Sequence, residues 1–271
     1  MSLEVRSLHE WEAAGVRDLL SVIVPAHNEQ GHIVGTVRGL AAALDDAGIN
    51  HEILVVNDNS SDDTESLLIG LASEYPQVRW ISNLPPAGYG FAVRSGLAAF
   101  RGDAAAIVMS DGSDDPADLV RFYRKLQVGY DCVFGSRFIR NASVSDYPLP
   151  KLLLNRLGNL FIQLLFLIRY NDVTNAFKLY RRSAIAGMQP ILSNHFNLTV
   201  EMPLKCIVRG YRYAVVPNSW RNRKEGISKF RIREMGSRYL FIILYCLIEK
   251  MLSRGDFIQP DRTAQLQIWP R

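Results

Sequence analysis

The stretch AAIVMSDGSDDP, Ala105–Pro116, joins an apolar run to three carboxylates. A strand that buries Ile107, Val108 and Met109 would present Asp111, Asp114 and Asp115 just beyond its carboxyl end. Ligands bind at that edge of an open α/β sheet, and carboxylates among small residues suit a hard divalent cation that holds phosphate oxygens. The alternative is a polar turn whose aspartates cap the following helix.

Strand and helix patterns alternate around this stretch over about the first 140 residues. Short β-branched runs occupy residues 19–26, 52–57 and 78–82, and each precedes a polar segment and a helix pattern. Alternation at this spacing predicts an α/β fold with a doubly wound, mostly parallel sheet. The strand ends should meet at one edge, so that several acidic loops form one site.

The second half of the chain contains two helices with unusually wide apolar arcs. Residues 151–168 read KLLLNRLGNLFIQLLFLI, a nearly all-apolar segment in which Lys151, Asn155, Asn159 and Gln163 recur every fourth residue. Residues 239–251 read YLFIILYCLIEKM. Residues 219–238 beside them carry seven Lys or Arg against two Glu. Wide apolar arcs flanked by basic residues favour a monotopic membrane contact over a buried core.

Between these helices the patterns are less regular. Asp172–Tyr180 and Tyr211–Trp220 are predicted strands, and Phe196–Val208 is a predicted helix interrupted near Pro203.

Composition excludes several classes of protein. The three cysteines are far apart, without metal-ligand spacing, and indicate reduced core residues of an intracellular protein. The first residues lack the apolar core of a signal peptide, and no segment has about 18 uninterrupted apolar residues, so no transmembrane helix is expected. No stacking-aromatic pattern supports nucleic acid as a partner, and the absence of Gly-x-Gly-x-x-Gly argues against a nicotinamide dehydrogenase.

Seven motifs occur in an order that resembles a known family. SVIVPAHNE, VVNDNSSDDT, the acidic turn, GSRF, DVTNAFKLYRR, NLTVEMP and RKEGISKF follow one another between Leu19 and Arg254. They are similar to glycosyltransferase family 2, in its dolichol-phosphate mannose synthase branch. The resemblance implies a GT-A fold, a nucleotide-diphosphate sugar donor, a divalent cation (Mg²⁺ or Mn²⁺), a polyprenyl phosphate acceptor and inversion at the anomeric carbon.

The resemblance also assigns roles to residues by their place in the motifs. The nucleotide sugar would be bound by Pro25, Ala26, Asn28, Glu29, Asp58, Gly88 and Asp111. The cation would be held by Asp111, Asp114 and Asp115. The acceptor phosphate would be held by Arg137, Lys151, Arg223, Ser228 and Lys229. The catalytic set would be Asp111, Asp114, Arg137 and Glu201, the last being either a site group near the sugar or a satisfied buried acid.

The acidic signature departs from the family pattern of Asp-x-Asp. Aligned through Pro116, the second aspartate of the signature is replaced by Gly112, and Pro85 and Pro86 stand where a basic residue is usual before Gly88. A shifted ligand set, weaker metal binding and a different donor all remain open. Two alternatives follow: a hydroxyl acceptor, which needs a base such as Glu201 or Asp115, and a catalytically silent membrane-associated homologue.

These inferences give a domain plan. Residues 1–18 form an N-terminal extension, residues 19–235 the GT-A catalytic domain with an interfacial helix at about 150–169, residues 236–257 a second interfacial helix, and residues 258–271 a flexible tail. The protein is expected at the cytoplasmic face of a membrane as a peripheral or monotopic protein, with its oligomeric state undetermined.

Overall fold

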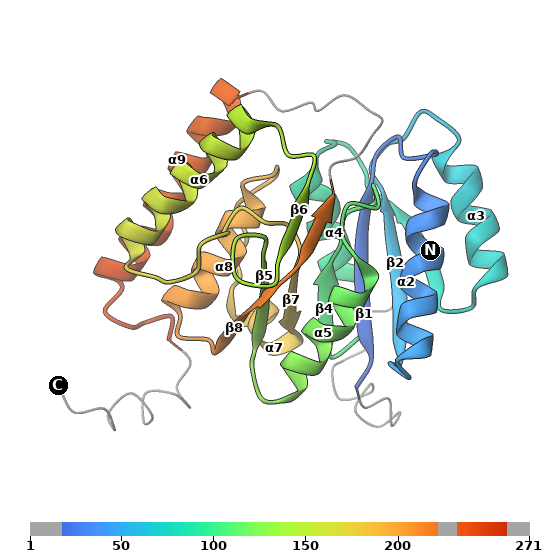
Figure 1. Cartoon of the computed structure of the whole chain (residues 1–271), viewed down its shortest axis with the longest axis horizontal. Coiled ribbons are helices and arrows are strands. Elements are labelled where there is room, and N and C mark those ends of the chain that lie inside the picture. The colour runs from blue at the N-terminus through green and yellow to red at the C-terminus, as the bar shows by residue number, and fades with distance from the viewer. Residues whose placement is uncertain (1–17, 222–231, 259–271) are drawn as a thin grey trace.

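The computed structural model describes residues 18–221 and 232–258. A seven-stranded sheet with strand order β3-β2-β1-β4-β7-β5-β8 forms its centre (Figure 1). Its strands are β1 Leu20–Ala26, β2 His51–Asn57, β3 Val78–Ser82, β4 Ala104–Ile107, β5 Cys132–Ser136, β7 Lys178–Arg181 and β8 Tyr213–Pro217. All run parallel except β7, which pairs antiparallel with both β4 and β5. The predicted α/β fold with a mostly parallel sheet is confirmed.

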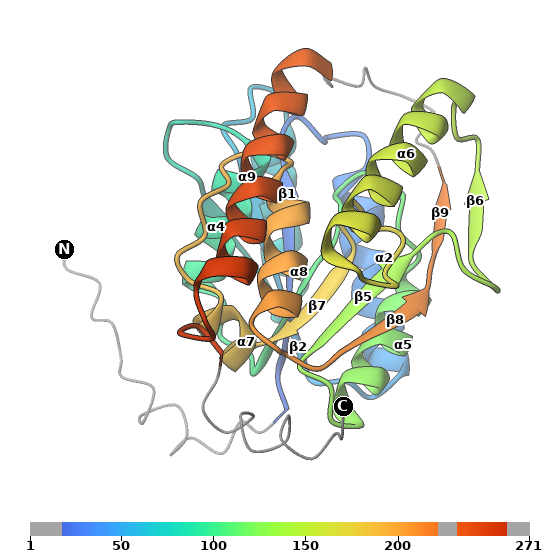
Figure 2. The same ribbon diagram turned by 90° about the vertical axis from the view of Figure 1, so that its left-hand side faces the viewer.

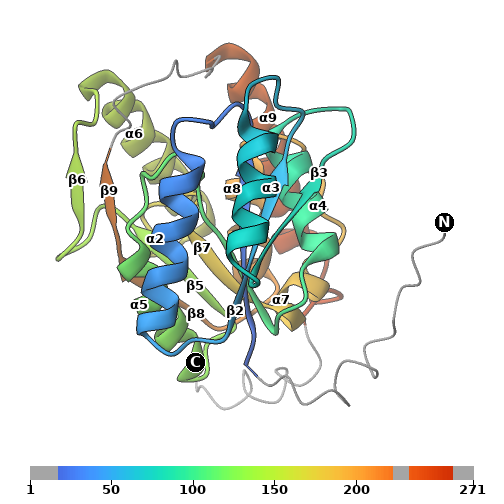
Figure 3. The same ribbon diagram turned by 90° about the vertical axis from the view of Figure 1, so that its right-hand side faces the viewer.

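Helices cover both faces of this sheet (Figures 2 and 3). One face carries α2 Ile33–Asp46, α3 Thr64–Glu74 and α5 Pro116–Gln127. The other carries α4 Tyr89–Ala99, α6 Leu149–Phe166, α7 Arg182–Gly187, α8 Leu198–Val208 and α9 Ile232–Leu252. A separate two-stranded parallel sheet joins β6 Ser143–Ser145 to β9 Ser219–Arg221.

Strand β1 explains why two cores form. All seven of its residues are buried, as expected for a parallel strand covered on both faces. Alternate side chains point to opposite faces, so Ile23 joins the core under α4 while Val22 and Val24 join the core under α2. Gly96 lets α4 approach closely, since a Cβ there would lie 2.5 Å from Ile23 Cγ2.

The structure corrects three expected elements. The predicted strand Tyr211–Trp220 is divided between β8 and β9, which belong to different sheets. Strand β7, Lys178–Arg181, overlaps only the last three residues of the predicted strand Asp172–Tyr180. Residues 172–175 form a loop at the edge where the parallel strands end. Helix α8 is not interrupted at Pro203. Proline lacks the N–H that would bond the carbonyl four residues earlier, and Lys178 Nζ donates to that Thr199 oxygen instead, at 3.1 Å.

Candidate active site

The carboxyl ends of β1, β2, β4 and β5 bring most of the predicted residues to one edge of the sheet. These strands run in the same direction, so the segments that follow them lie side by side. The loop at residues 172–175 reaches the same edge because β7 runs the opposite way. Arg223, Ser228 and Lys229, predicted to hold the acceptor phosphate, lie outside the described residues.

The turn after β1 is fixed to the loop after β2. Asn28 has φ 55° and accepts a hydrogen bond from Ser61 N through Oδ1, at 2.7 Å, while Glu29 N donates to Thr64 Oγ1 at 2.9 Å. Pro25 and Ala26 are buried within β1, beside β2. Their predicted contacts with a nucleotide stay a prediction.

Asp58 links the end of β2 to the turn before α4. It is 5% exposed, its Oδ2 accepts from Gly88 N at 2.8 Å, and its Oδ1 accepts from Asn83 Nδ2 at 2.8 Å. Both oxygens of Asp58 therefore accept hydrogen bonds from the protein, and the bond from Gly88 N fixes the position of the turn before α4. Each carboxylate oxygen can accept more than one hydrogen bond, so a further bond to a nucleotide is compatible with this arrangement.

The three aspartates of the acidic turn have different surroundings. Asp111 Oδ1 accepts from Ser113 N at 3.1 Å, and Asp114 Oδ2 accepts from Met109 N at 3.2 Å. Asp115 is the N-cap of α5, with Oδ1 accepting from Ala117 N at 2.9 Å. The capping alternative thus describes Asp115, while the other two carboxylates are turned to the interior of the loop.

Asp114 is a buried acid beside a second acid. It is 8% exposed, and burial is the main reason that its pKa rises to about 7; the charge of Asp111 raises the pKa further, whereas the Met109 N–H and Arg137 oppose the rise. Within residues 18–221 and 232–258, no three His, Cys, Asp or Glu side chains are grouped to hold a metal ion. Asp111 and Asp114 lie close enough for their charges to interact, and a divalent cation held by them stays a prediction.

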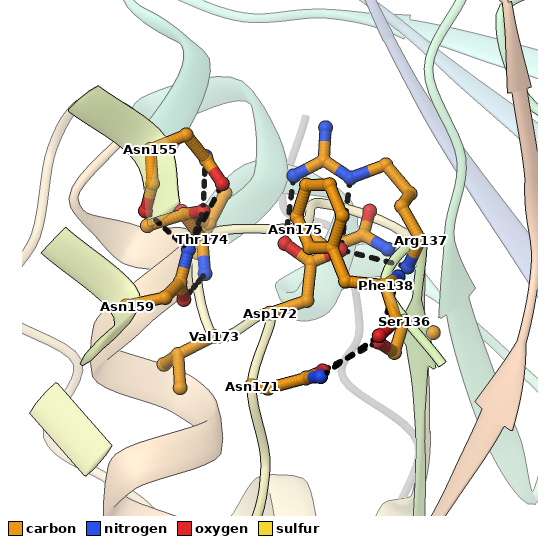
Figure 4. Close-up of polar contacts among 12 residues, drawn as sticks. Ser136, Arg137, Phe138, Asn155, Asn159, Asn171, Asp172, Val173, Thr174 and Asn175 are labelled. Carbon is orange, nitrogen blue, oxygen red and sulfur yellow. Dashed lines mark hydrogen bonds and ion pairs between the residues drawn. The ribbon is translucent and has the colours of Figure 1, made fainter. Parts of the chain in front are cut away.

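Arg137 follows β5 and is held by a buried carboxylate. Its Nε and Nη2 donate to the two oxygens of Asp172 at 2.8 and 2.7 Å, and its backbone N donates to Oδ2 at 2.9 Å (Figure 4). Asp172 is fully buried, and its charge raises the pKa of Arg137 against the opposing effect of burial. Rings of Phe138, Tyr147 and Trp220 surround the guanidinium. The planar group is thereby held in one orientation.

A cleft of about 580 Å³ opens beside this guanidinium. Its lining contains two arginines, one carboxylate and four apolar or aromatic side chains, namely Arg137, Arg156, Asp146, Phe138, Val144, Tyr147 and Leu152. Sequence reasoning missed Arg156, which stacks on Phe138 with its Cζ 4.4 Å from the ring centre. Its position directly after the polar Asn155, in an otherwise apolar helix, was the available signal. Lys151, predicted in this role, is exposed in the first turn of α6 and does not line the cleft.

Glu201 has a structural environment, which corrects its prediction as a catalytic group. It is fully buried, its Oε1 accepts from Lys205 Nζ at 2.6 Å, and its two oxygens accept from Leu192 N and Ser193 N at 2.8 and 2.7 Å. Lys205 is equally buried. The satisfied buried acid, and not a group facing a sugar, describes this residue.

Helix α6 is oriented with its polar stripe toward the protein. Asn155 and Asn159 both donate to Thr174 Oγ1, at 2.8 and 3.0 Å (Figure 4), and Asn159 is 1% exposed. The opposite side is apolar and exposed at Leu149, Leu153, Leu154, Leu157, Leu160, Phe161 and Leu164. Helix α9 lies nearby at the same end of the molecule (Figure 1) and exposes Leu240, Phe241, Leu244, Ile248 and Met251. No described helix is long and apolar enough to span a bilayer.

Fold and site together define an α/β transferase of the GT-A type, with acids at the central strand ends and arginines beside them. The chain belongs to glycosyl transferase family 2, whose family model matches residues 21–187. It is 28% identical over 236 residues to polyprenol monophosphomannose synthase of Mycolicibacterium smegmatis, covering 80% of this chain and 86% of that protein. It is also 28% identical over 212 residues to glycosyltransferase AglD of Haloferax volcanii, covering 77% of this chain and 34% of that protein.

Solved structures share the fold. Glucosyl-3-phosphoglycerate synthase from Mycobacterium tuberculosis, in complex with UDP, superposes with a TM-score of 0.64 at 18% identity, covering 92% of this chain and 86% of that chain. The same enzyme with Mn²⁺ and UDP-glucose gives a TM-score of 0.63 at 19% identity, over 92% of this chain and 84% of that one. The predicted GT-A fold is confirmed.

Proposed function

We propose that this protein is an inverting glycosyltransferase that moves a hexose from a nucleotide-diphosphate sugar to a polyprenyl phosphate at a membrane surface. The observation that carries the proposal is the position of the cleft at Arg137 and Arg156. Its Arg137 lies near enough to Asp114 for their charges to interact, and its Leu152 and Arg156 belong to α6, which has an exposed apolar face. In a polyprenyl phosphate, the phosphate would suit the two arginines of the cleft and the long apolar tail would suit the exposed side of α6. The similarity to polyprenol monophosphomannose synthase supports the same acceptor class.

In the proposed reaction an acceptor phosphate oxygen attacks the anomeric carbon of the hexose. A C–O bond forms to the acceptor, and the bond from that carbon to the donor diphosphate breaks, with the electron pair leaving on the diphosphate. The attacking oxygen is already an anion, so no general base is needed. The protein's task is to bring two anionic groups together, for which Arg137, fixed by Asp172, and Arg156 supply positive charge.

A divalent cation would sit at Asp111 and Asp114 and neutralise negative charge on the leaving diphosphate. The two adjacent carboxylates, one of them buried, favour such a cation because it would relieve their repulsion. Mn²⁺ accompanies UDP-glucose in the fold relative described above. Asp58 and the turn that it holds at Gly88 would position the nucleoside. Peripheral attachment to the cytoplasmic face of a membrane, through α6 and α9, completes the proposal.

The alternative hydroxyl acceptor is less well supported, because its reaction needs a base. Glu201 is buried in an ion pair with Lys205, and Asp115 caps α5. Both carboxylates already accept hydrogen bonds from protein groups, so neither is well placed to take a proton from an acceptor hydroxyl.

The test is transfer of radiolabel from a panel of GDP- and UDP-hexoses to undecaprenyl or dolichyl phosphate in detergent, with Mg²⁺ or Mn²⁺. We expect label in the lipid fraction for one donor, and loss of that label in Asp111→Ala with the fold retained. Arg124→Gln, in the last turn of α5 and outside the cleft lining, is the matched control. If no donor labels the lipid fraction, the proposal is wrong; donor binding measured by calorimetry then separates a silent homologue from an enzyme with another acceptor.

A further inference from the structure

The loop of residues 171–175, which lies between α6 and β7, contacts both arginines of the cleft at Arg137. Arg137 donates to the two carboxylate oxygens of Asp172, and Arg156 Nη1 donates to the backbone oxygen of Asn171 at 3.4 Å. The two guanidinium groups come from different elements, since Arg137 follows β5 and Arg156 lies on α6. The 171–175 loop therefore connects the two positive charges that the proposed reaction needs.

Thr174 attaches this loop to α6 through its hydroxyl group. Its Oγ1 accepts from Asn155 Nδ2 at 2.8 Å and from Asn159 Nδ2 at 3.0 Å, and its backbone N donates to Asn159 Oδ1 at 3.4 Å (Figure 4). A hydroxyl oxygen can accept two hydrogen bonds, and the two amides provide both. Because Asn155 directly precedes Arg156, these bonds fix the part of the helix that carries this guanidinium.

The part of α6 around Arg156 has little other attachment to the core. The buried side chains of α6 are Asn159, Ile162 and Phe166, all of which follow Arg156 in the sequence. The C-terminal end of the helix is also held by α9, since Lys250 Nζ donates to the oxygen of Phe166 at 2.5 Å. The N-terminal half of α6 therefore depends on the asparagine contacts with Thr174 for its position.

A buried ammonium group holds the 171–175 loop from the opposite side. Lys178 is 1% exposed, and its Nζ donates to the backbone oxygen of Val173 at 3.0 Å and to that of Asn175. These two carbonyls flank Thr174 in the sequence. The backbone around Thr174 is thus fixed from the core, and the Thr174 hydroxyl transmits this fixed position to α6.

We propose that Thr174 is a positioning residue for the acceptor phosphate, because its hydroxyl sets the separation between Arg156 and Arg137. Two guanidinium groups held at a fixed separation bind one phosphate more tightly than groups that must be ordered on binding, since ordering costs conformational entropy. The inference rests on the proposed function, which assigns the two arginines to the acceptor. The competing explanation is that the hydrogen bonds of Thr174 stabilise the fold and nothing more.

Two substitutions at Thr174 separate the hydroxyl from the rest of the side chain. Thr174→Val removes Oγ1 and keeps a similar shape, whereas Thr174→Ser keeps the oxygen. We expect Thr174→Val to lower kcat/KM for polyprenyl phosphate in detergent, at saturating donor, by about five- to ten-fold, through a higher KM. Thr174→Ser should stay within about two-fold of wild type. The affinity for nucleotide, measured by calorimetry, should not change in either variant.

A double-mutant cycle shows whether Thr174 acts through Arg156. If the hydroxyl acts by placing that guanidinium, Thr174→Val should cost less than about two-fold more in an Arg156→Ala protein. Losses that multiply in full in the double variant would overturn the proposal. Wild-type kinetics of Thr174→Val would overturn it too, and so would equal losses in Thr174→Val and Thr174→Ser.

Thermal melts establish that each variant is folded. Asn159 Nδ2 also donates to the backbone oxygen of Asn155 at 2.9 Å, so Thr174→Val leaves this buried amide with a partner. If Thr174→Val does not fold, Asn155→Ala removes a donor to the same hydroxyl from the half-buried side of α6 and carries the same cycle with the same outcomes. Wild-type protein that transfers no hexose would overturn the proposed function and this inference together. Wild-type transfer with any of the contrary results above would overturn this inference alone.

Discussion

Asp114 combines burial with a neighbouring negative charge, and its protonation should therefore govern stability. Its pKa of about 7 in the folded state lies above the value of about 4 in an unfolded chain. The folded protein thus binds this proton more tightly than the unfolded chain does. The resulting stabilisation is present below about pH 4 and is lost as the pH rises through 7.

We expect Asp114→Asn to raise the free energy of unfolding at about pH 8, by roughly 1–4 kcal/mol, and to change it little at about pH 4. Urea unfolding of both proteins at the two pH values, without divalent cations, measures the difference. Adding Mn²⁺ with a nucleoside diphosphate at the higher pH should stabilise the wild-type protein more than the variant. A variant less stable than wild type at about pH 8 would contradict this account of Asp114.

Glu201 and Lys205 form a buried ion pair, and removing either side chain should destabilise the protein. Removing one partner of a buried ion pair leaves the other charge without compensation, so Glu201→Gln should lower the free energy of unfolding by about 3–5 kcal/mol. Glu201→Gln combined with Lys205→Met should recover part of that loss. Urea unfolding and transfer per folded molecule are the measurements. A Glu201→Gln protein with wild-type stability and no transfer would return Glu201 to the reaction.

Arg156 is expected to act on the acceptor and not on the donor. A hydrogen bond to a charged group contributes about 1.5–3 kcal/mol, so Arg156→Ala should reduce kcat/KM for polyprenyl phosphate by about 10- to 100-fold. The affinity for nucleotide, measured by calorimetry, should not change. Lys151→Ala, in the first turn of the same helix but outside the cleft, is the matched comparison. Equal losses in both variants would indicate a general effect of charge on α6.

At the scale of elements, α6 reverses the usual arrangement of a surface helix. Soluble helices turn their apolar stripe to the core, whereas α6 buries Asn159 on Thr174 and exposes leucines at 47–77%. Ile162 and Phe166 still pack in the core, so the helix is anchored at its C-terminal half. A large exposed apolar patch marks an interaction surface.

We therefore expect a substitution on the outer side of α6 to weaken membrane binding and one on the inner side to lower the stability of the fold. Leu164→Glu should leave the free energy of unfolding within about 0.5 kcal/mol of wild type and reduce vesicle binding by about ten-fold or more. Asn159→Ala, on the inner side, should cost about 1–3 kcal/mol of stability, because Thr174 loses a partner. Urea unfolding and vesicle co-sedimentation report the two effects. Unchanged vesicle binding in Leu164→Glu would remove this side of α6 from the membrane contact.

At the scale of the whole molecule, α9 belongs to the core that covers one face of the sheet. Ile242, Ile243 and Cys246 are buried against this core, and Glu249 forms a buried ion pair with Arg209, with Nε–Oε1 and Nη2–Oε2 distances of 2.7 and 2.9 Å. The predicted C-terminal interfacial helix is therefore continuous with the domain that precedes it.

A chain shortened to residues 1–231 should consequently fail to fold stably, since it exposes this core and leaves Arg209 without its partner. A chain ending at residue 258 keeps every described element and should melt as the full chain does. Circular dichroism melts and limited proteolysis compare the three proteins. A cooperative melt of residues 1–231 at the wild-type temperature would show that α9 is dispensable for the fold.

The sequence by itself determined the alternation of strands and helices, the acidic turn at the end of β4 and the narrow polar stripe of α6. These features are local, because hydrophobic periodicity depends on side chains a few residues apart. Tertiary structure decided which side of α6 faces inward, that Arg137 is held by Asp172, that Glu201 is buried, and that Arg156 lines the cleft. The antiparallel insertion of β7 between β4 and β5 brings residues 172–175 to the active-site edge. The ion pair between Arg137 and Asp172 joins residues 35 positions apart and depends on that topology. No local sequence pattern encodes it.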